Sequence, residues 1–261
     1  MRFFSRRAII YGGPLIAKDV TVSVLHTLLN ELKSCLSGRA IYLEVRNFLD
    51  YSEYRDAFLS AGFSHLPYLG YIIDTSTNDV FSRIQRRKRE QISSALRRGV
   101  SICDNPSVAD VEAFYRILCH LHRYKTRTPV PPISFFLSLA GSSVGRVILM
   151  KNADGIVISG SAVMFLPDGT LYHFYVAGDD CSFKFLFPST MAHWSIIKYS
   201  VEHNIAHCDL MGAGLPGIHD NLIAFKRKWG GAITTADRFL YPLDKLQYNL
   251  GRFAVTIFRK L

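Results

Sequence analysis

The chain has 261 residues, of which 49% are hydrophobic and 13% aromatic, so it has enough apolar material for a large core and global disorder is excluded. Its five cysteines form no C-x-x-C pair, which argues against a disulfide framework or structural zinc site and favours a reducing compartment. No window approaches the 18 consecutive apolar residues of a spanning helix, so any membrane role is peripheral.

The net charge of +10 is concentrated in two stretches of the chain. Residues 83–98 hold seven basic residues and one acid, and residues 226–260 hold eight basic residues and two acids. Each stretch therefore carries +6, and the rest of the chain carries −2. We expect an anionic partner, such as a nucleic acid or a membrane surface, to meet one of these two stretches.

The first part of the chain is predicted to alternate helices and strands. Gly12-Gly13-Pro14 interrupts the apolar run that follows the N-terminal arginines, so a secretory signal is not expected. Strand 41–45, helix 52–61 and strand 66–73 follow a first helix, 20–36. That first helix has apolar residues at the spacing of one helical face: Val20, Val24, Leu28, Leu32 and Leu36.

The second part opens, after a basic helix, with a short strand at 100–103 and a helix that Ser107 and Asp110 cap. The buried stripe expected in this helix is Val111, Phe114, Leu118 and Leu121. A short helix near 133–139 comes next. Strands 144–150, 156–165 and 170–176 then form an antiparallel meander, with turns at Asp154-Gly155 and Asp168-Gly169.

The chain is predicted to end in helix 190–203, strand 205–210, a glycine-rich loop 211–219, helix 221–226 and strand 233–241. The element order from 100 onward resembles the GNAT acyltransferase fold. Because the elements of 20–73 have the same order as those of 190–241, we expect an α+β chain of tandem GNAT-like folds whose first copy lacks its front half. The expected divisions are a partial first repeat (1–78), a basic connecting helix (79–99), a complete second domain (100–242) and a basic amphipathic helix (243–261).

An ordered set of motifs resembles the Fem-type (FemAB-like) transferases. The set is Tyr11-Gly12-Gly13-Pro14, Pro188-Ser189-Thr190, His193-Trp194-Ser195-Ile196-Ile197-Lys198-Tyr199, Asp209-Leu210-Met211-Gly212 and Phe225-Lys226-Arg227-Lys228-Trp229-Gly230-Gly231, together with the 86–100 helix and the closing 242–261 helix. The resemblance implies two tandem GNAT-like folds that move amino acids from aminoacyl-tRNA to the peptide stem of cell-wall precursors. Two departures stand against it: the family's first domain begins further upstream of the Tyr-Gly-Gly segment, and its helical hairpin insertion has no counterpart in 80–99.

A GNAT-like fold has its reactive centre where two parallel strands part, which predicts a site at the ends of 170–176 and 205–210. Lys226 is the predicted catalytic cation, by resemblance and by placement, and it would stabilise the oxyanion formed during acyl transfer. The alternative is a solvated lysine at a helix terminus. The motif also makes Phe225 and Trp229 candidate substrate-binding residues.

The attacking amine must lose a proton, and the candidates for the general base are Asp209, Tyr175 and His173. Asp209 has the alternative role of capping the following loop, and Tyr175 that of packing. His173 is also a candidate substrate-binding residue. Gly212 and Gly214 either bend the loop or let a substrate approach its backbone, and Gly217 lies in the same loop.

A continuous basic helix would bring five arginines within an arc of about 120°. They are Arg83, Arg86, Arg87, Arg97 and Arg98. This patch is predicted to bind the phosphates of tRNA or the diphosphate of a nucleotide- or lipid-linked precursor, because arginine matches phosphate geometry. The alternative is an ordinary solvated face.

In the last helix an apolar stripe lies beside a basic one. The apolar residues are Leu243, Leu246, Leu250, Phe253, Ile257 and Leu261, and the basic ones are Lys245, Arg252 and Arg259. Two interpretations stay open: the helix lies on an anionic membrane, or it docks onto the protein's own core. No metal site is expected, although Cys119, His120 and His122 lie close in sequence.

The sequence therefore predicts a transferase that moves an aminoacyl or acyl group from an activated donor to an amine of a cell-wall or envelope precursor, in peptidoglycan biosynthesis by resemblance. The expected co-substrate is aminoacyl-tRNA, with no tightly bound cofactor, and the expected place is the cytoplasm or the inner face of the membrane. One alternative is an acyl-CoA-dependent N-acyltransferase of polysaccharide or lipid synthesis, although residues 178–184 form no phosphate loop and contain two acids. The other is a non-catalytic RNA- or membrane-binding remnant.

Overall fold

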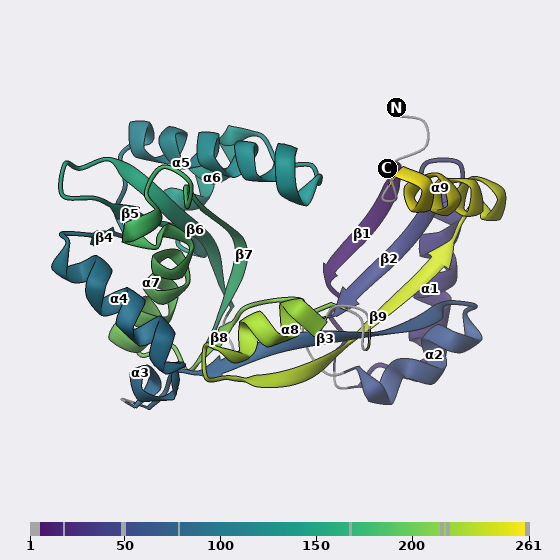
Figure 1. Ribbon diagram of the computed structural model, residues 1–261. Helices are drawn as coiled ribbons and strands as arrows, with labels where there is room; N and C mark the ends of the chain where they lie inside the picture. Colours follow the sequence, from purple (N-terminus) through teal and green to yellow (C-terminus); the bar gives the residue numbers. More distant parts are fainter. Residues whose placement is uncertain are drawn as a thin grey trace. The chain divides into compact units, whose positions relative to one another are not determined.

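The computed structural model describes residues 6–17, 19–47, 51–77, 79–166, 169–214, 217 and 220–258 (Figure 1). The chain forms two compact units, unit 1 with residues 1–69 and 235–261, and unit 2 with residues 70–234. Strands β3 (Ser64–Asp74) and β9 (Ala232–Pro242) each contain a boundary between these units. The predicted divisions at residues 78, 99 and 242 were drawn from the repeated order of elements, whereas the two units are defined by compactness. These divisions therefore stay predictions.

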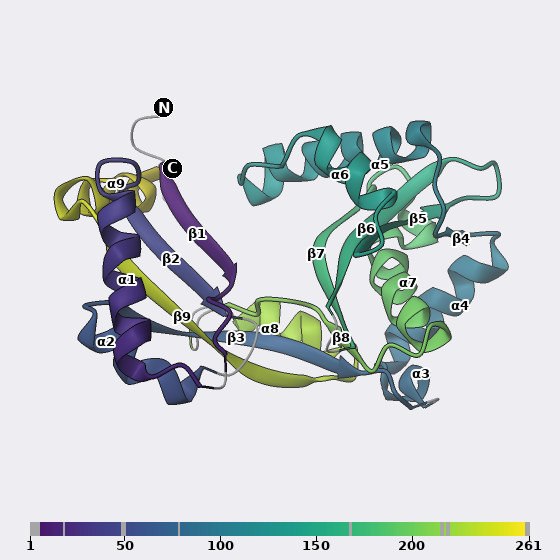
Figure 2. The same cartoon turned by 180° about the vertical axis from the view of Figure 1, so that it is seen from behind.

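Unit 1 is built on a mixed sheet in the order β1-β2-β9-β3. The first strand of this order, β1 (Arg7–Gly12), pairs in parallel with β2 (Tyr42–Asn47). β9 pairs with β2 in the antiparallel sense, from Tyr42↔Pro242 to Arg46↔Arg238. Helices α1 (Val22–Leu36) and α2 (Arg55–Ser60) pack on one face of the sheet, where Figure 2 shows α1 in front of the strands.

The buried face of α1 differs from the predicted one. Leu25 and Leu29 are buried, whereas Val24 and Leu28 are more than half exposed. Steps of four residues advance about 40° beyond a full turn each time, so a strict four-residue spacing winds around the helix. Steps of four, three and four residues from Leu25 to Leu36 stay on one side, and this is the side that contacts the sheet.

Unit 2 continues with a sheet in the order β9-β3-β8-β7-β6-β5-β4. The predicted meander is confirmed, because β6 (Val157–Leu166) pairs in the antiparallel sense with both β5 (Gly145–Lys151) and β7 (Thr170–Gly178). The short strand β4 (Ser101–Cys103) closes one edge. At the other side β7 pairs in parallel with β8 (His207–Asp209).

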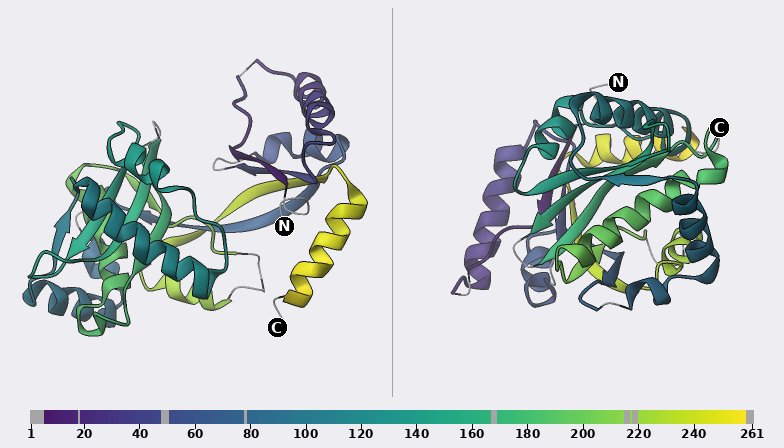
Figure 3. Two further views of the ribbon diagram at one scale, coloured as in Figure 1. Left: turned by 90° about the horizontal axis from the view of Figure 1, so that it is seen from above. Right: turned by 90° about the vertical axis from the view of Figure 1, so that its left-hand side faces the viewer.

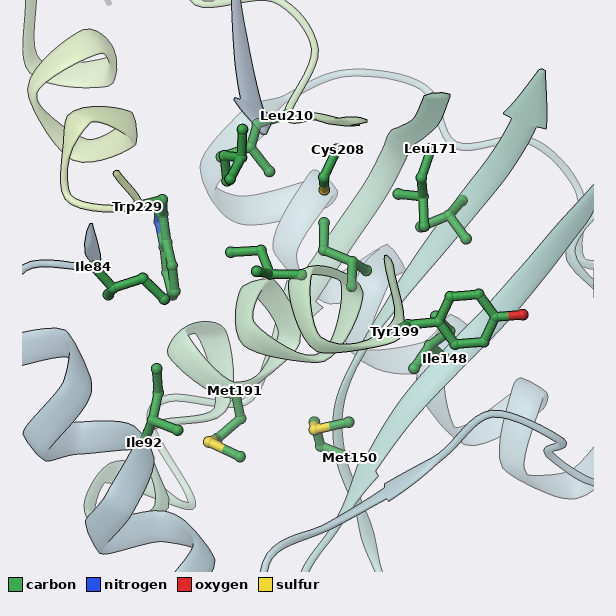
Figure 4. Packing of buried hydrophobic residues seen from close by; sticks show 14 of the residues in the cluster. Ile84, Ile92, Ile148, Met150, Leu171, Met191, Tyr199, Cys208, Leu210 and Trp229 are labelled. Carbon is green, nitrogen blue, oxygen red and sulfur yellow. The ribbon is translucent and has the colours of Figure 1, made fainter. Parts of the chain in front are cut away.

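Helices cover both faces of the unit 2 sheet, as Figures 1 and 3 show. One face carries α5 (Val108–Leu121), which begins at the predicted capping box of Ser107 and Asp110, and α6 (Ile133–Ala140). The other face carries α7 (Pro188–Glu202) and α4 (Arg86–Arg97). Between α7, α4 and the strands lies a core that includes Met191, Ile92 and the fully buried Trp229 (Figure 4).

The predicted basic helix is interrupted. A short helix α3 (Val80–Arg83) ends before Ile84 and Gln85, whose backbone is extended with ψ of 137° and 135°, and α4 starts only at Arg86. Contacts with distant parts of the chain cause this interruption, because Ile84 is 1% exposed and the Gln85 N–H donates to the Lys228 carbonyl at 2.9 Å. The expectation that Arg83 shares a helical face with the later arginines is therefore wrong.

The core of unit 1 is expected to depend on Phe58, which is fully buried and stacks on Phe239 with a centroid distance of 4.0 Å. Phe58→Ala leaves a cavity and should lower the free energy of unfolding by about 3–5 kcal/mol. Leu59→Ala, at a side chain 44% exposed, is the matched control and should cost less than about 1 kcal/mol. Urea titration followed by far-UV circular dichroism measures both, and equal midpoints for the two variants would contradict this account of the core.

Candidate functional site

The parallel strands β7 and β8 part where the sequence predicts a reactive centre. Their pairing runs from Thr170↔His207 to Tyr172↔Asp209 and ends there. Beyond it, β7 continues to Gly178, whereas β8 ends at Asp209, and the following Leu210 N–H donates to the Tyr71 carbonyl of β3 at 2.8 Å, one step further along the β3–β8 ladder. His173 and Leu210 are thus the first residues on either side of the opening, a position where backbone groups lose their sheet partners.

Lys226 lies in this region and is buried, with 6% of its surface exposed. Its ammonium donates to three consecutive carbonyls, those of Leu210 at 2.6 Å, Met211 at 2.9 Å and Gly212 at 2.9 Å. An ammonium has three protons, so these carbonyls account for all of them. The alternative of a solvated helix-terminal lysine is therefore wrong. Lys226 belongs to α8 (Asp220–Arg227) and holds the loop that follows β8.

The geometry of this loop fixes where its amides point. Met211 has a φ of 62°, an unusual left-handed conformation for a residue with a side chain. In a trans peptide the C=O and N–H groups point in opposite directions. Because the carbonyls of Met211 and Gly212 point to Lys226, the N–H groups of Gly212 and Ala213 point away from it. The loop thus directs two adjacent amides away from the ammonium.

Asp209 takes part in the same loop. Its Oδ1 accepts the Met211 N–H at 2.6 Å, which is the capping role set out as the alternative to catalysis. Gly214 and Gly217 bend the loop as predicted, with φ of 95° and 73°, values that favour glycine. Gly212 does not have a positive φ. Residues 215, 216, 218 and 219 of the predicted loop lie outside the described residues.

Burial shifts the titration of Asp209 and Lys226 in opposite directions. Removal from water raises the pKa of Asp209 to about 6, although the Met211 N–H and the charge of Lys226 lower it in part. Burial also lowers the pKa of Lys226 to about 8, against the attraction of Asp209. Near neutral pH the site therefore has an ionised carboxylate of raised basicity beside a lysine that deprotonates unusually easily.

Two buried histidines, His173 and His193, lie near Lys226. The His173 Nε2–H donates to Ser161 Oγ at 2.9 Å, because that hydroxyl itself donates to the Ala192 carbonyl. His193 donates from Nδ1 to the Ser189 carbonyl at 2.8 Å and stacks on Trp229 with a centroid distance of 5.2 Å. Burial lowers the pKa of His193 to about 4 and that of His173 well below its ordinary value, so both rings are neutral at physiological pH.

Lys88 is a site residue that sequence reasoning missed. Its ammonium donates to Thr190 Oγ1 at 2.7 Å and lies over the rings of Phe225 and Trp229, 5.6 Å from each centroid. Burial lowers its pKa, with a further contribution from Lys228. The available signal was spacing, since Lys88 precedes the buried Ile92 by four residues and therefore lies on the inner face of α4.

The structure does not gather the five predicted arginines into one patch. Arg83 donates to the Asp74 carbonyl at 2.6 Å, and Arg98 donates to the Phe185 carbonyl at 3.0 Å. Arg86, which also pairs with Glu90 at 2.8 Å, and Arg97 share a surface hollow of about 450 Å³. Arg87 is exposed. The hollow also includes Arg89, so it is a smaller basic site than the predicted one.

Tyr175 does not converge with the other candidates. The register of β7 shifts between Val163↔His173 and Ala162↔Tyr175, so β7 has one extra residue, Phe174, between these two pairs. Such a bulge reverses the alternation of side chains. His173 therefore faces α7, whereas Tyr175 packs against Phe136 on the opposite face, with a centroid distance of 5.3 Å. This is the packing role set out as the alternative, and Tyr175 lies away from Lys226.

The N-terminus of α7 already holds an anionic group. Asp180 accepts the Ser189 N–H at 3.0 Å and also the Ser189 hydroxyl. A helix N-terminus at this place is where a phosphate would bind, because its amides are unpaired within the helix. The carboxylate of the chain itself thus fills the position that an acyl-CoA diphosphate would need.

Among the residues that the structure describes, no group of three or more His, Cys, Asp or Glu side chains is arranged to hold a metal ion. None of the described helices has both the length and the apolar character to cross a membrane.

Residues 143–256 match the model of the FemAB family. The chain is also similar to the crystal structure of FemX, with a TM-score of 0.69 and 17% identity over 93% of this chain and 82% of that one. L-PGS from Bacillus licheniformis gives a TM-score of 0.67 and 11% identity over 95% and 82% of the two chains. Comparison with curated proteins finds no match.

A third similar structure is the C-terminal domain of a putative lysylphosphatidylglycerol synthetase from Agrobacterium fabrum, with a TM-score of 0.63 and 12% identity over 90% of this chain and 78% of that one. The predicted resemblance to the FemAB family and the predicted GNAT-like α+β class are confirmed. β7, β8, α7 and Lys226 all lie inside the matched segment. At the family level, this supports an acyl or aminoacyl transferase.

The raised pKa of Asp209 makes stability depend on pH. The folded chain binds this proton more tightly than the unfolded chain, so its stabilising effect is present below about pH 4 and is lost as the pH rises through about 6. In the wild type the free energy of unfolding should therefore fall by on the order of 2 kcal/mol as the pH rises through this window. Asp209→Asn cannot titrate at this position, so the variant should not show this fall. Urea titrations at stepped pH measure the difference between wild type and variant.

The exposed Asp104 of the same unit supplies the control. Asp104→Asn should leave the pH profile of the wild type unchanged. If Asp209→Asn and the wild type have parallel profiles between pH 4 and 6, the burial that we assign to Asp209 is wrong.

Proposed function

From the FemAB match over residues 143–256, we propose that the chain transfers an aminoacyl or acyl group from an activated ester to an amine of a cell-wall or envelope precursor. The observation that carries the proposal is the loop after β8, which Lys226 holds with three carbonyls toward its ammonium, so that two amides point away from it. We infer that these amides face the opening between β7 and β8, where they would be suited to an oxyanion. Aminoacyl-tRNA is the proposed donor.

The reaction needs a group that stabilises negative charge on the ester carbonyl oxygen. We assign this task to the N–H groups of Gly212 and Ala213. A cation on the carbonyl side of a peptide strengthens the N–H donor on the other side, because hydrogen-bonded groups polarise one another. Lys226 thereby acts as a positioning residue that orients and polarises the amides.

The remaining chemistry is one substitution at the carbonyl carbon. The amine nitrogen forms a bond to that carbon, the ester C–O bond breaks, and the leaving oxygen takes up a proton to become a hydroxyl. Asp209 is the proposed acceptor of the amine proton, because a carboxylate with a pKa of about 6 is ionised at neutral pH yet more basic than an ordinary aspartate. Tyr175 faces the other side of the sheet and has no part in this step.

The aminoacyl-tRNA-dependent and the acyl-CoA-dependent transferase differ in their donor. Asp180 on the Ser189 amide disfavours a coenzyme A diphosphate at the start of α7, so the acyl-CoA alternative is less well supported. The hollow beside Arg86, Arg89 and Arg97 suits the phosphates of tRNA. Because charged tRNA is a cytoplasmic molecule, we propose that the enzyme works in the cytoplasm, on a nucleotide- or lipid-linked precursor.

Lys226→Met removes the ammonium but keeps the length of the side chain. We expect kcat to fall about 10²-fold or more with little change in KM, because the amides are used in the transition state. The assay follows transfer of a radiolabelled amino acid from charged tRNA to an amine acceptor. Arg227→Met, at the exposed neighbouring residue, is the control and should keep wild-type turnover.

Circular dichroism of Lys226→Met shows whether a loss of turnover is a loss of folding. The same assay with acetyl-CoA tests the alternative donor. Turnover with acetyl-CoA and none with charged tRNA would replace the proposed donor, and tRNA binding without any turnover in wild type would indicate the non-catalytic remnant. Full activity of folded Lys226→Met would refute the role assigned to the loop.

A further inference from the structure

The last helix, α9 (Lys245–Phe258), presents an uncovered apolar stripe. Leu246, Leu250 and Phe253 are 71%, 52% and 66% exposed, and at 100° per residue they fall in an arc of about 60°. For these three residues the interpretation that the stripe docks onto the protein's own core is wrong. Leu243, just before the helix, does pack against the core of unit 1. The side chains of Ile257, Arg259 and Leu261 lie outside those that the structure describes.

The opposite side of α9 explains why the stripe faces outward. Tyr248 packs edge-on against Tyr42 of β2, with a centroid distance of 5.4 Å, and it lies about 200° around the helix from Leu246. The Asp244 N–H donates to the Ile41 carbonyl at 2.9 Å and fixes the start of the helix on the same unit. Figure 3 shows α1 and α9 on opposite sides of the unit 1 strands. The helix is thus anchored by one side only.

Basic residues flank the stripe, and acids are absent from the sequence of this segment. Lys245 and Arg252 are exposed and lie about 100–120° from Leu246 around the helix, on the same flank. The Arg252 guanidinium lies over the Tyr248 ring, 5.8 Å from its centroid, which holds it beside the helix. Residues 245–261 contain four basic residues and no Asp or Glu. The surface therefore combines an apolar stripe with a positive margin.

One class of partner offers an apolar interior and a negative surface together, the bilayer with anionic lipids. A second copy of the chain would bring the same positive margins together and repel. With 14 residues α9 is about 21 Å long, less than the roughly 30 Å of a hydrocarbon core, so a position in the plane of the interface fits it better than a spanning one. We propose that α9 docks unit 1 on an anionic membrane surface, with Leu246, Leu250 and Phe253 inserted and Lys245 and Arg252 among the headgroups.

The test uses the full chain and vesicles of phosphatidylcholine with or without about one third phosphatidylglycerol. Wild type should sediment with the anionic vesicles and not with the neutral ones, and binding should weaken as salt rises from about 0.1 M to about 0.5 M. The triple variant Leu246→Gln, Leu250→Gln, Phe253→Gln should lower partitioning about tenfold or more. Lys245→Ala with Arg252→Ala should lower it about fivefold for each charge removed.

A matched control removes exposed apolar residues from another helix of the same unit. Val24→Gln with Leu28→Gln, at side chains 56% and 52% exposed on α1, should leave vesicle binding unchanged. Circular dichroism melts of all variants show that unit 1 stays folded. Because binding is measured without turnover, the result does not depend on the proposed transferase activity.

Three outcomes would overturn the proposal. The first is equal binding of wild type to neutral and anionic vesicles, or binding to neither. The second is wild-type binding by the folded triple variant, which would place the membrane contact elsewhere. The third is a wild-type dimer in sedimentation velocity that the triple variant abolishes, which would make the stripe a contact between copies.

Discussion

A buried ammonium is the constraint on which the rest of the site depends. Lys226 has left bulk water, so each of its three protons needs an acceptor inside the protein. The nearest acceptors are the carbonyls of the loop after β8, and they reach the ammonium only because Met211 adopts a positive φ. The carboxylate of Asp209 then accepts the remaining N–H of this turn, that of Met211. The turn of the backbone, the cap and the two amides that point away from the ammonium are consequences of one requirement.

The position of the lysine is also fixed by the residues that follow its helix. Trp229 packs fully buried against His193, and the two glycines after it permit a close approach of chains. A Cβ at Gly230 would lie 2.7 Å from the Arg83 carbonyl oxygen, and one at Gly231 would lie 2.2 Å from that of Ile72. No side chain fits there without a shift of the backbone. The glycines of the Phe-Lys-Arg-Lys-Trp-Gly-Gly motif thus serve the placement of Lys226 as well as the turn.

The sequence predicted most of the elements and the place where β7 and β8 part, because these features rest on local patterns. Turn dipeptides, the Ser107 and Asp110 cap and the order of strands required only neighbours along the chain. The contacts of Lys226, the break at Ile84 and the reversed side of Tyr175 required partners far along the chain. A bulge of one residue inverts the side to which a side chain points, and nothing in the composition of β7 indicates it.

Net charge alone does not locate the binding surfaces of this chain, because several of its cations interact with other groups of the protein. Of the first basic stretch, Arg83, Arg98 and Lys88 are bound to groups of the protein itself. Of the second, Lys226 is buried on its loop, and Arg238 lies 3.2 Å from the centroid of the Tyr68 ring while bonding Glu44.

The described residues of the two stretches include two smaller positive surfaces. One is the hollow of Arg86, Arg89 and Arg97 in unit 2, and the other is the flank of α9 with Lys245 and Arg252 in unit 1. They differ in what accompanies the charge. The hollow is lined by three arginines together with Glu90, Ser93 and Phe81, and its cations suit a phosphate, whereas the flank adjoins exposed leucines and a phenylalanine, as a lipid surface requires. The same residue types therefore favour different anions, and the neighbouring side chains decide which.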